Sequence, residues 1–518
     1  MTSELNFIAS HGFKSNPFES TNSETEELLE EYFVPPPFFV TVLGDPSTPK
    51  SSAVFAPRGS GKTAQRRMIE INSAAVGTFL CITYDKFDIS KGAKLSLEQH
   101  LHELCRLLTM GILSHLQEDS VRVSQLNDHE KQIVKACAIT FAGSMTTTQY
   151  SDAVNAIKSL GDKLSDFWNK YGGPIAAAIG LLMKKAGLDG VNVSVQLQAQ
   201  TREPASFRYF YEQLVSVIQK LDLKAVYILV DKVDENSLTT NDATAAFETI
   251  RALITDLPTL ELKGIAYKFF LWDQLLDAFR AQGGRPDRIN VVELKWTVDE
   301  LTQMLSRRLK AFSDEKIHSF NQIVDPKIKL DVHKMLAYLS NGSPRDMIRM
   351  GYEILSQHMR TDAGEALISE KVLLNGIWNY CRDRSNELYS SFIADFTKVG
   401  TSDFTMNDLA NNIFKKTVPA VQARVLKWQN AGAVRKIGEL ANRKSRPTYL
   451  YGFTDLKTVI SINPQGSVKA VLEKNSVECP TCKSIIISSQ HSMTCEVCAT
   501  TFIRSDALNL LQVCALDV

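Results

Sequence analysis

The fold of this chain is decided by one stretch, Ala53-Val54-Phe55-Ala56-Pro57-Arg58-Gly59-Ser60-Gly61-Lys62-Thr63. An apolar run ends in a turn with two glycines, and a helix-forming sequence follows it. The pattern is close to G-x-x-x-x-G-K-[ST], the phosphate-binding loop that joins a buried strand to a helix. Glycines let backbone N–H groups approach a phosphate closely, and the helix N-terminus behind them favours an anion. We therefore expect a nucleotide to bind at this loop.

The residues expected to touch the nucleotide are Arg58, Gly59, Ser60, Gly61, Lys62 and Thr63. Lys62 would reach the β- and γ-phosphates, and the Thr63 hydroxyl would ligate Mg²⁺. Ala56 stands where the pattern has its first glycine, and its Cβ restricts the turn. The match is therefore incomplete, and a surface turn without a ligand is the alternative.

Length and charge bound the class of protein. The 518 residues predict roughly three or four domains. Lys+Arg and Asp+Glu both number 58, so a nucleic-acid contact would need a local basic patch. The N-terminus lacks the pattern of a secretory signal, and the apolar run 174–183 is about half of a membrane-spanning helix. Five isolated cysteines fit buried thiols. The sequence predicts a soluble, cytoplasmic protein without a membrane contact.

A second apolar run, Ala225 to Val230, ends in acidic residues. In a doubly wound sheet the ligand lies beyond the carboxyl ends of the strands. Asp231 would then hold the Mg²⁺ shell, directly or through water, and Glu235 or Asp234 would orient the attacking water. The alternative is a strand that ends in a solvated acidic turn.

The order of residues in Asp231 to Glu235 resembles the second motif of the STAND class of ATPases, including NACHT-type proteins. These proteins are relatives of the AAA+ and origin-initiator ATPases. The apolar run 263–271 falls where such ATPases have the strand next to the acidic one. The resemblance places a γ-phosphate sensor near Asp273, an unusual residue for that role, which we leave unassigned.

Two arginine positions follow from the same resemblance. Arg285 or Arg288 corresponds to an arginine that reaches the nucleotide of a neighbouring subunit. Arg345, at a helix start after a glycine turn, corresponds to the second sensor, which contacts the γ-phosphate. The alternatives are a solvated turn and a surface arginine. The resemblance thus implies a homo-oligomer.

The resemblance and the patterns together predict an α/β fold with a P-loop parallel sheet. We expect an N-terminal segment (1–50), a P-loop ATPase domain (51–295, with a helical insertion at about 124–203), a helical lid (296–384), a winged helix (385–465) and a zinc ribbon (466–518). Before the loop, Asn16-Pro17-Phe18 or Tyr32 to Pro37 would cover the base of the nucleotide, or would form a hydrophobic clasp.

The expected winged helix leaves two readings open. Its second helix carries Arg424 and Lys427, and the hairpin after it carries Arg443, Lys444 and Arg446. In a DNA-binding protein that helix would enter the major groove and the hairpin would contact phosphates. In STAND proteins a winged helix packs on the nucleotide domain as part of the switch.

The C-terminal region carries two C-x-x-C pairs, Cys479/Cys482 and Cys495/Cys498, separated by twelve residues. Four thiolates satisfy tetrahedral Zn²⁺ and leave no open position, so we predict a structural zinc site. His491 lies between the pairs and is expected to be a loop residue rather than a ligand.

The expected reaction is hydrolysis of ATP to ADP and phosphate by in-line attack of water, with Mg²⁺ as cofactor. Three roles stay open. The first is a STAND-type switch in bacterial defence that oligomerises with ATP and acts on a separately encoded effector. The second is a DNA-binding initiator or transposition-type AAA+ ATPase. The third is a non-hydrolysing scaffold, suggested by Lys232 where many AAA+ enzymes carry glutamate.

Overall fold

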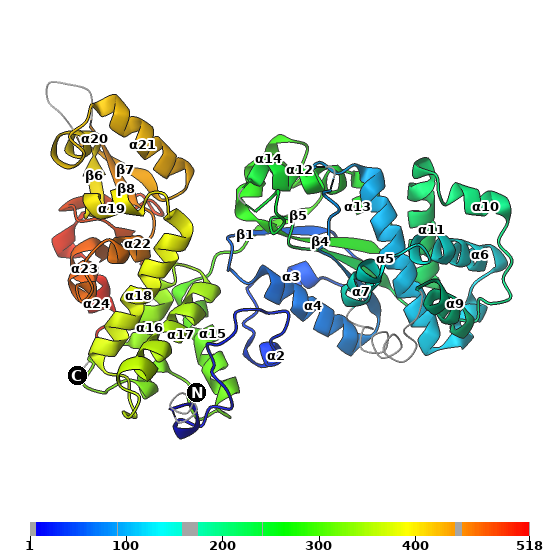
Figure 1. Cartoon of the computed structure of the whole chain (residues 1–518), viewed down its shortest axis with the longest axis horizontal. Coiled ribbons are helices and arrows are strands. Elements are labelled where there is room, and N and C mark those ends of the chain that lie inside the picture. The colour runs from blue at the N-terminus through cyan, green and yellow to red at the C-terminus, as the bar shows by residue number, and fades with distance from the viewer. Residues whose placement is uncertain (1–6, 91, 158–174, 241, 441–447, 517–518) are drawn as a thin grey trace. The chain divides into compact units, whose positions relative to one another are not determined.

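The computed structural model describes residues 7–90, 92–157, 175–240, 242–440 and 448–516. The chain divides into two compact units (Figure 1). The sheet unit spans Pro35–Lys295, and the helical unit combines the chain up to Val34 with the chain from Trp296 onwards. The sheet unit is therefore an insertion in the helical unit, and two peptide connections join them.

Five parallel strands form the centre of the sheet unit. They are β1 (Ser52–Ala56), β2 (Phe79–Tyr84), β3 (Ala225–Val230), β4 (Ile265–Trp272) and β5 (Asn290–Glu293). Their order across the sheet is β2-β3-β4-β1-β5. Strands β1 to β4 are buried almost throughout, which explains their continuous apolar sequences. The predicted α/β fold with a parallel sheet is confirmed.

The strand register brings several carboxyl ends to one edge of the sheet. Ala56, the last residue of β1, pairs with Trp272, the last residue of β4. Tyr84 and Val230 end β2 and β3 and pair with each other. Strand β4 lies between β1 and β3, so the apolar run after residue 263 is next to the acidic strand as predicted.

Helices cover the sheet and form the rest of the sheet unit. Helices α5 (Leu97–Glu118) and α11 (Phe207–Lys220) pack on each other and on the sheet. Helix α5 begins with a capping box of Ser96 and Gln99. The described part of residues 124–203 is mainly helical, and residues 158–174 lie outside that part. The other helical elements are α3 (Phe39–Leu43), α4 (Lys62–Val76), η1 (Ser120–Gln125), α6 (Asp128–Cys137), η2 (Ala138–Ala142), α7 (Thr147–Ala156), α9 (Ile175–Lys185), α10 (Val195–Gln200), η3 (Pro204–Ser206), α12 (Ala243–Ile254), α13 (Leu257–Leu260), η4 (Asp273–Leu275) and α14 (Leu276–Ala281).

The helical unit begins with a group of helices and ends with small sheets. Its helical elements are α2 (Leu29–Tyr32), α15 (Val298–Phe312), η5 (Phe320–Ile323), α16 (Val332–Leu339), α17 (Pro344–Thr361), α18 (Glu370–Tyr389), α19 (Ile393–Val399), α20 (Met406–Asp408), η6 (Leu409–Ile413), α21 (Val418–Asn430), α22 (Leu456–Ser461), α23 (Val468–Asn475), η7 (Arg504–Asp506) and α24 (Leu510–Val513). Its strands are β6 (Asp403–Thr405), β7 (Val434–Leu440), β8 (Thr448–Phe453), β9 (Ser476–Glu478), β10 (Ile485–Ile487), β11 (Ser492–Thr494) and β12 (Thr501–Ile503). The antiparallel pairings are β6-β8-β7, β9-β10 and β11-β12. Among the described helices, none combines the length and the apolar composition that crossing a bilayer requires.

Residues 7–34 of the N-terminal segment pack within the helical unit. The buried guanidinium of Arg308 on α15 donates to the carbonyl oxygens of Pro17 and Ser20 and lies 4.6 Å from the ring centroid of Tyr32. Phe18 packs against Phe320, and a Cβ added at Gly351 would lie 2.4 Å from its ring. Phe18 and Tyr32 thus have the contacts of a hydrophobic clasp.

A buried lysine lies in the middle of the sheet. Lys268 on β4 is 1% exposed, and its amine donates to the carbonyl oxygen of Lys50 at 2.7 Å. The amine lies 4.8 Å from the ring centroid of Tyr227. Burial lowers the pKa of Lys268 from 10.5 to about 7. Between these values the unfolded chain binds a proton that the folded chain does not bind, so this group makes the protein more stable as pH rises.

We predict that Lys268→Met removes this pH dependence. Relative to the variant, the wild type should gain roughly 3–5 kcal/mol of unfolding free energy between pH 7 and pH 10. Urea titrations of both proteins at a series of pH values measure the difference. Lys263→Met is the matched control, because Lys263 is exposed. Equal pH profiles for wild type and Lys268→Met would show that Lys268 is charged at pH 7.

Candidate functional site

The glycine loop, residues 57–61, joins β1 to α4 at the carboxyl edge of the sheet. Gly59 and Gly61 have φ values of 80° and 89°, a region that favours glycine. Gly61 is the N-cap of the 15-residue helix α4, so the first N–H groups of that helix follow the loop directly. Ala56 is the last residue of β1, and an extended strand position does not need glycine.

Lys62 is folded back over this loop. Its Nζ donates to the carbonyl oxygens of Ala56 at 2.9 Å and Pro57 at 3.2 Å. The Ser60 hydroxyl donates to Pro57 as well, at 2.7 Å. Burial lowers the pKa of Lys62, against the opposing effect of four carboxylates: Asp234, Asp231, Asp273 and Glu235. Four carboxylates thus act on the amine of Lys62 from the carboxyl edge of the sheet.

Asp231 and Thr63 meet although they lie on different elements. The Thr63 hydroxyl donates to Asp231 Oδ2 at 3.0 Å, and the Lys232 N–H donates to Asp231 Oδ1 at 2.9 Å. Asp231 is 2% exposed, and Arg66 Nε also donates to its Oδ2 at 3.0 Å. Both oxygens already accept hydrogen bonds, which suits a contact with Mg²⁺ through water.

Arg66 belongs to a buried polar group that the sequence analysis missed. Its guanidinium pairs with Glu70 and donates to the Thr83 hydroxyl, and Thr83 donates to Glu70. Arg66, Glu70 and Thr83 are all buried. The spacing of Arg66 and Glu70 by one helical turn was the available signal. Through Arg66, this buried group fixes the position of the Asp231 carboxylate.

The residue after Asp231 is also unusual. Lys232 has a φ of 57°, and its Nζ lies 3.0 Å from Asp85 Oδ2. Asp85 directly follows β2, so both residues lie at the carboxyl edge of the sheet. The sequence analysis did not identify Asp85, and its place directly after a strand was the available signal.

Asp234 and Glu235 have different surroundings. Asp234 is 4% exposed and accepts a hydrogen bond from Arg58 Nε at 2.7 Å. Glu235 is exposed. Asp273, the first residue after β4, has a raised pKa because of partial burial, and the nearby Asp234 adds to this effect while Lys62 opposes it. Beside the glycine loop the structure thus brings together the predicted site residues Arg58, Lys62, Thr63, Asp231, Asp234 and Glu235.

The arginines predicted from the family resemblance, Arg285 or Arg288 and Arg345, have other surroundings. Arg288 forms an exposed ion pair with Glu261 at 2.7 Å, and Arg285 forms one with Asp287 at 2.6 Å. Arg345 belongs to the helical unit, where it is exposed in the first turn of α17. No hydrogen bond or ion pair of Arg345 occurs within the part of the chain that the structure describes.

The four predicted zinc ligands gather in the helical unit. Their sulfur atoms all lie within 4.8 Å of one another, and the Cys479–Cys498 and Cys482–Cys495 separations are 3.6 and 3.5 Å. A tetrahedral zinc ion with Zn–S bonds of about 2.3 Å separates its ligands by roughly 3.8 Å. The cluster therefore fits zinc, and His491 is not part of it.

The cysteine segment, residues 479–498, is hydrogen-bonded to the rest of the helical unit. Asp403, at the start of β6, accepts hydrogen bonds from the Ser488 hydroxyl at 2.8 Å, the Ser489 N–H at 2.6 Å and Gln490 Nε2 at 2.9 Å. After the segment, the Cys514 carbonyl accepts from the Asp331 N–H at 2.7 Å. A metal ion that orders this segment would therefore also help to fix the positions of α16 and β6.

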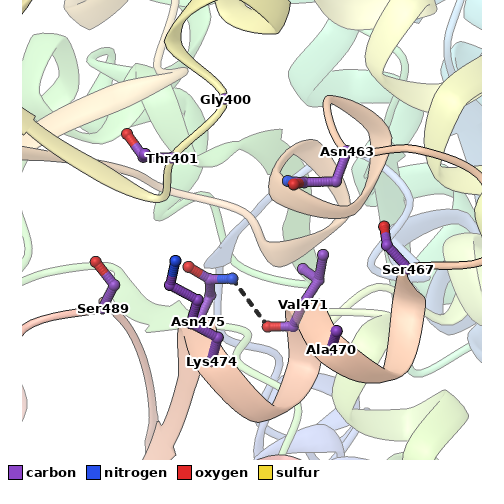
Figure 2. Close-up of a pocket in the computed structure, with 9 residues that line it drawn as sticks. All are labelled: Gly400, Thr401, Asn463, Ser467, Ala470, Val471, Lys474, Asn475 and Ser489. Carbon is purple, nitrogen blue, oxygen red and sulfur yellow. Dashed lines mark hydrogen bonds between the residues drawn. The ribbon is translucent and has the colours of Figure 1, made fainter.

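A polar pocket of about 130 Å³ lies beside this anchor (Figure 2). The Thr401 hydroxyl donates to the Asp403 carbonyl and the Ser489 hydroxyl to its carboxylate. Asn475 Nδ2 donates to the Val471 carbonyl. Lys474 is the charged residue of the lining. None of the predicted site residues lines this pocket.

Comparisons with known proteins were made on the sequence and on the fold. No family model matches the chain, and no curated protein matches it. The ORC1 protein of Aeropyrum pernix, solved in complex with DNA, is similar with a TM-score of 0.37 and 11% identity, over 86% of this chain and 97% of that one. The ORC2 protein of Aeropyrum pernix, solved in ADPNP-ADP complexes, is similar with a TM-score of 0.38 and 11% identity, over 89% and 98%. Both scores are low, so these similarities support no functional conclusion.

We predict that the purified protein holds about one zinc ion per chain in the cysteine cluster. Cys482→Ser should lose it, because three thiolates and a hydroxyl bind zinc far more weakly than four thiolates do. Elemental analysis of the metal content measures this. His491→Ala, a change in the same segment outside the cluster, should keep the metal. Full metal content in Cys482→Ser would contradict the assignment.

Proposed function

We propose that the sheet unit binds Mg–ATP and hydrolyses ATP to ADP and phosphate. The observation that carries the proposal is the 3.0 Å contact between Thr63 and Asp231 beside the glycine loop. It joins a hydroxyl at a helix N-terminus to a buried carboxylate, and this pair suits the Mg²⁺ of a bound triphosphate. The positive φ values of Gly59 and Gly61 support a loop whose backbone can approach phosphates.

The residues have separate tasks in this proposal. Lys62 leaves the carbonyl oxygens of Ala56 and Pro57 and binds the β- and γ-phosphates. Thr63 and Asp231 would hold Mg²⁺, which when bound would supply positive charge to the phosphate oxygens.

Glu235 is assigned to the attacking water, because the alternative, Asp234, is buried and paired with Arg58. The water oxygen forms a bond to the γ-phosphorus as the bond to the β–γ bridging oxygen breaks. The water proton passes to Glu235, and the bridging oxygen leaves with ADP.

We expect Lys62→Ala to abolish Mg–ATP binding and Glu235→Gln to keep binding while it lowers turnover by about 10²-fold or more. Titration calorimetry with Mg–ATP and a phosphate-release assay measure the two effects. Lys263→Ala, a change of an exposed lysine in the same unit, is the control. Unchanged binding by Lys62→Ala would refute the proposed site, and unchanged turnover by Glu235→Gln would leave the scaffold as the better interpretation.

DNA binding by the predicted winged helix, residues 385–465, is the second candidate. This region includes the three-stranded antiparallel sheet β6-β8-β7 and the helical elements α19, α20, η6, α21 and α22. A helix of such a module can enter the major groove of DNA. The observation that favours DNA is a group of exposed lysines without ion pairs among the described residues: Lys415, Lys416 and Lys427. Arg424 and Arg435, in contrast, pair with Asp395 and Glu496.

The basic hairpin tip with Arg443, Lys444 and Arg446 lies outside the described residues. Oligomerisation through Arg288 stays a prediction. The described residues carry no feature that supports a role in bacterial defence or a separately encoded effector.

If the lysine group contacts DNA, changing Lys415, Lys416 and Lys427 to Ala should weaken binding at least about 10-fold. The slope of log affinity against log salt should fall in magnitude by about 2–3, since each lost phosphate contact removes nearly one unit. Fluorescence anisotropy with duplex DNA at several salt concentrations measures both. Changing the exposed lysines Lys327, Lys329 and Lys371 to Ala is the matched control. Identical slopes in the two triple variants would exclude this surface.

A further inference from the structure

Arg58 lies in the glycine loop, and its side chain is hydrogen-bonded to other parts of the protein. Its Nε donates to Asp234 Oδ2 at 2.7 Å, and its Nη2 donates to the carbonyl oxygens of Asp234, at 3.0 Å, and Thr240. The guanidinium also lies 4.3 Å from the ring centroid of Trp272. One side chain therefore connects the loop with the segment after β3 and with the end of β4.

This connection matches a second one at the far end of the loop. Thr63 follows the loop and contacts Asp231, the first residue after β3. Arg58 precedes the two glycines and contacts Asp234. The acidic segment Asp231 to Glu235 therefore contacts the chain on both sides of Gly59 and Gly61. It does so although β4 separates β1 from β3 in the sheet.

Charge and burial argue against a direct phosphate contact of Arg58. If the guanidinium moved to a phosphate, the carboxylate of Asp234 would stay 4% exposed without its cation. Leaving a buried charge unpaired is strongly unfavourable. Trp272 adds a stacking contact that would be lost as well.

We propose that Arg58 and Asp234 form a positioning pair, which holds the glycine loop open for a nucleotide without touching the phosphates. The inference rests on the proposed Mg–ATP site. It assigns both residues to the binding of the nucleotide rather than to the attack of water. The pair acts before the ligand arrives, so its loss lowers affinity and leaves turnover at saturating ATP near the wild-type rate.

The test compares Arg58→Ala, Asp234→Ala and the double variant by calorimetric titration with Mg–ATP and by steady-state hydrolysis. Each single variant should weaken binding roughly 10-fold or more. The double variant should be no weaker than the weaker single variant, because both changes remove the same link. Arg58→Lys, which keeps the charge and loses the two-nitrogen geometry, should lie between Arg58→Ala and the wild type.

The control is Arg251→Ala, which breaks the 3.0 Å pair with Glu248 on α12 and should keep full affinity. Asp234→Asn replaces Asp234→Ala if the latter does not fold. A direct phosphate contact predicts the opposite pattern, in which loss of Asp234 leaves binding unchanged or tightens it while loss of Arg58 weakens it. That pattern overturns the inference.

Unchanged affinity in both single variants also overturns it. If Lys62→Ala abolishes binding at the same time, the proposed function stands and the positioning pair alone fails. A wild-type protein that binds no Mg–ATP refutes the proposed function, and the inference with it.

Discussion

The candidate site depends on the contact between Thr63 and Asp231, and this contact depends on the strand register. The carboxyl ends of β1 and β3 lie at one edge of the sheet, with β4 between them. Helix α4 starts directly after the glycine loop, so its first turn reaches the end of β3. In a parallel sheet a register shift by one residue moves every side chain to the other face. The register thus places a hydroxyl and a carboxylate from residues 168 positions apart within one hydrogen bond.

Beside this contact the protein buries charged side chains instead of apolar ones. Arg66, Glu70 and Asp231 are all at most 3% exposed, and Arg66 pairs with both carboxylates. Burying an ion pair costs desolvation free energy that the attraction between its members often only balances. Such a group adds little stability compared with apolar packing. It does fix the position of Asp231, because an arginine fork offers geometry that an apolar contact lacks.

The helical unit joins its parts by similar means. Asp346, next to Arg345, is buried at the start of α17 and pairs with Lys457 of α22 at 3.2 Å. Asp403 holds the cysteine segment, and Lys334 on α16 donates to the carbonyl of Val513 at 3.3 Å. The region after the predicted lid is therefore bonded to the rest of the helical unit. The cysteine cluster belongs to a segment that is hydrogen-bonded to α16 and to β6.

Local patterns of residues determined a large part of this protein. Continuous apolar runs identified β1, β3 and β4, since strands buried on both faces need them. The hydrogen bonds of the capping boxes at Ser96 and Thr297 close within four residues, so neighbouring residues alone set these two helix starts. The paired C-x-x-C spacing identified the cysteine cluster in the same way.

Only the tertiary structure decided which polar groups meet. Arg58 looked like a phosphate ligand from its place in the loop, and its guanidinium instead pairs with Asp234. Asp85 follows β2 and Lys232 follows β3, and the two meet because these strands are neighbours in the sheet. The sequence also did not show that the N-terminal segment packs on the helical unit around Arg308. These contacts join residues far apart in the chain, and a long-range pairing is set by strand order and packing rather than by neighbouring residues.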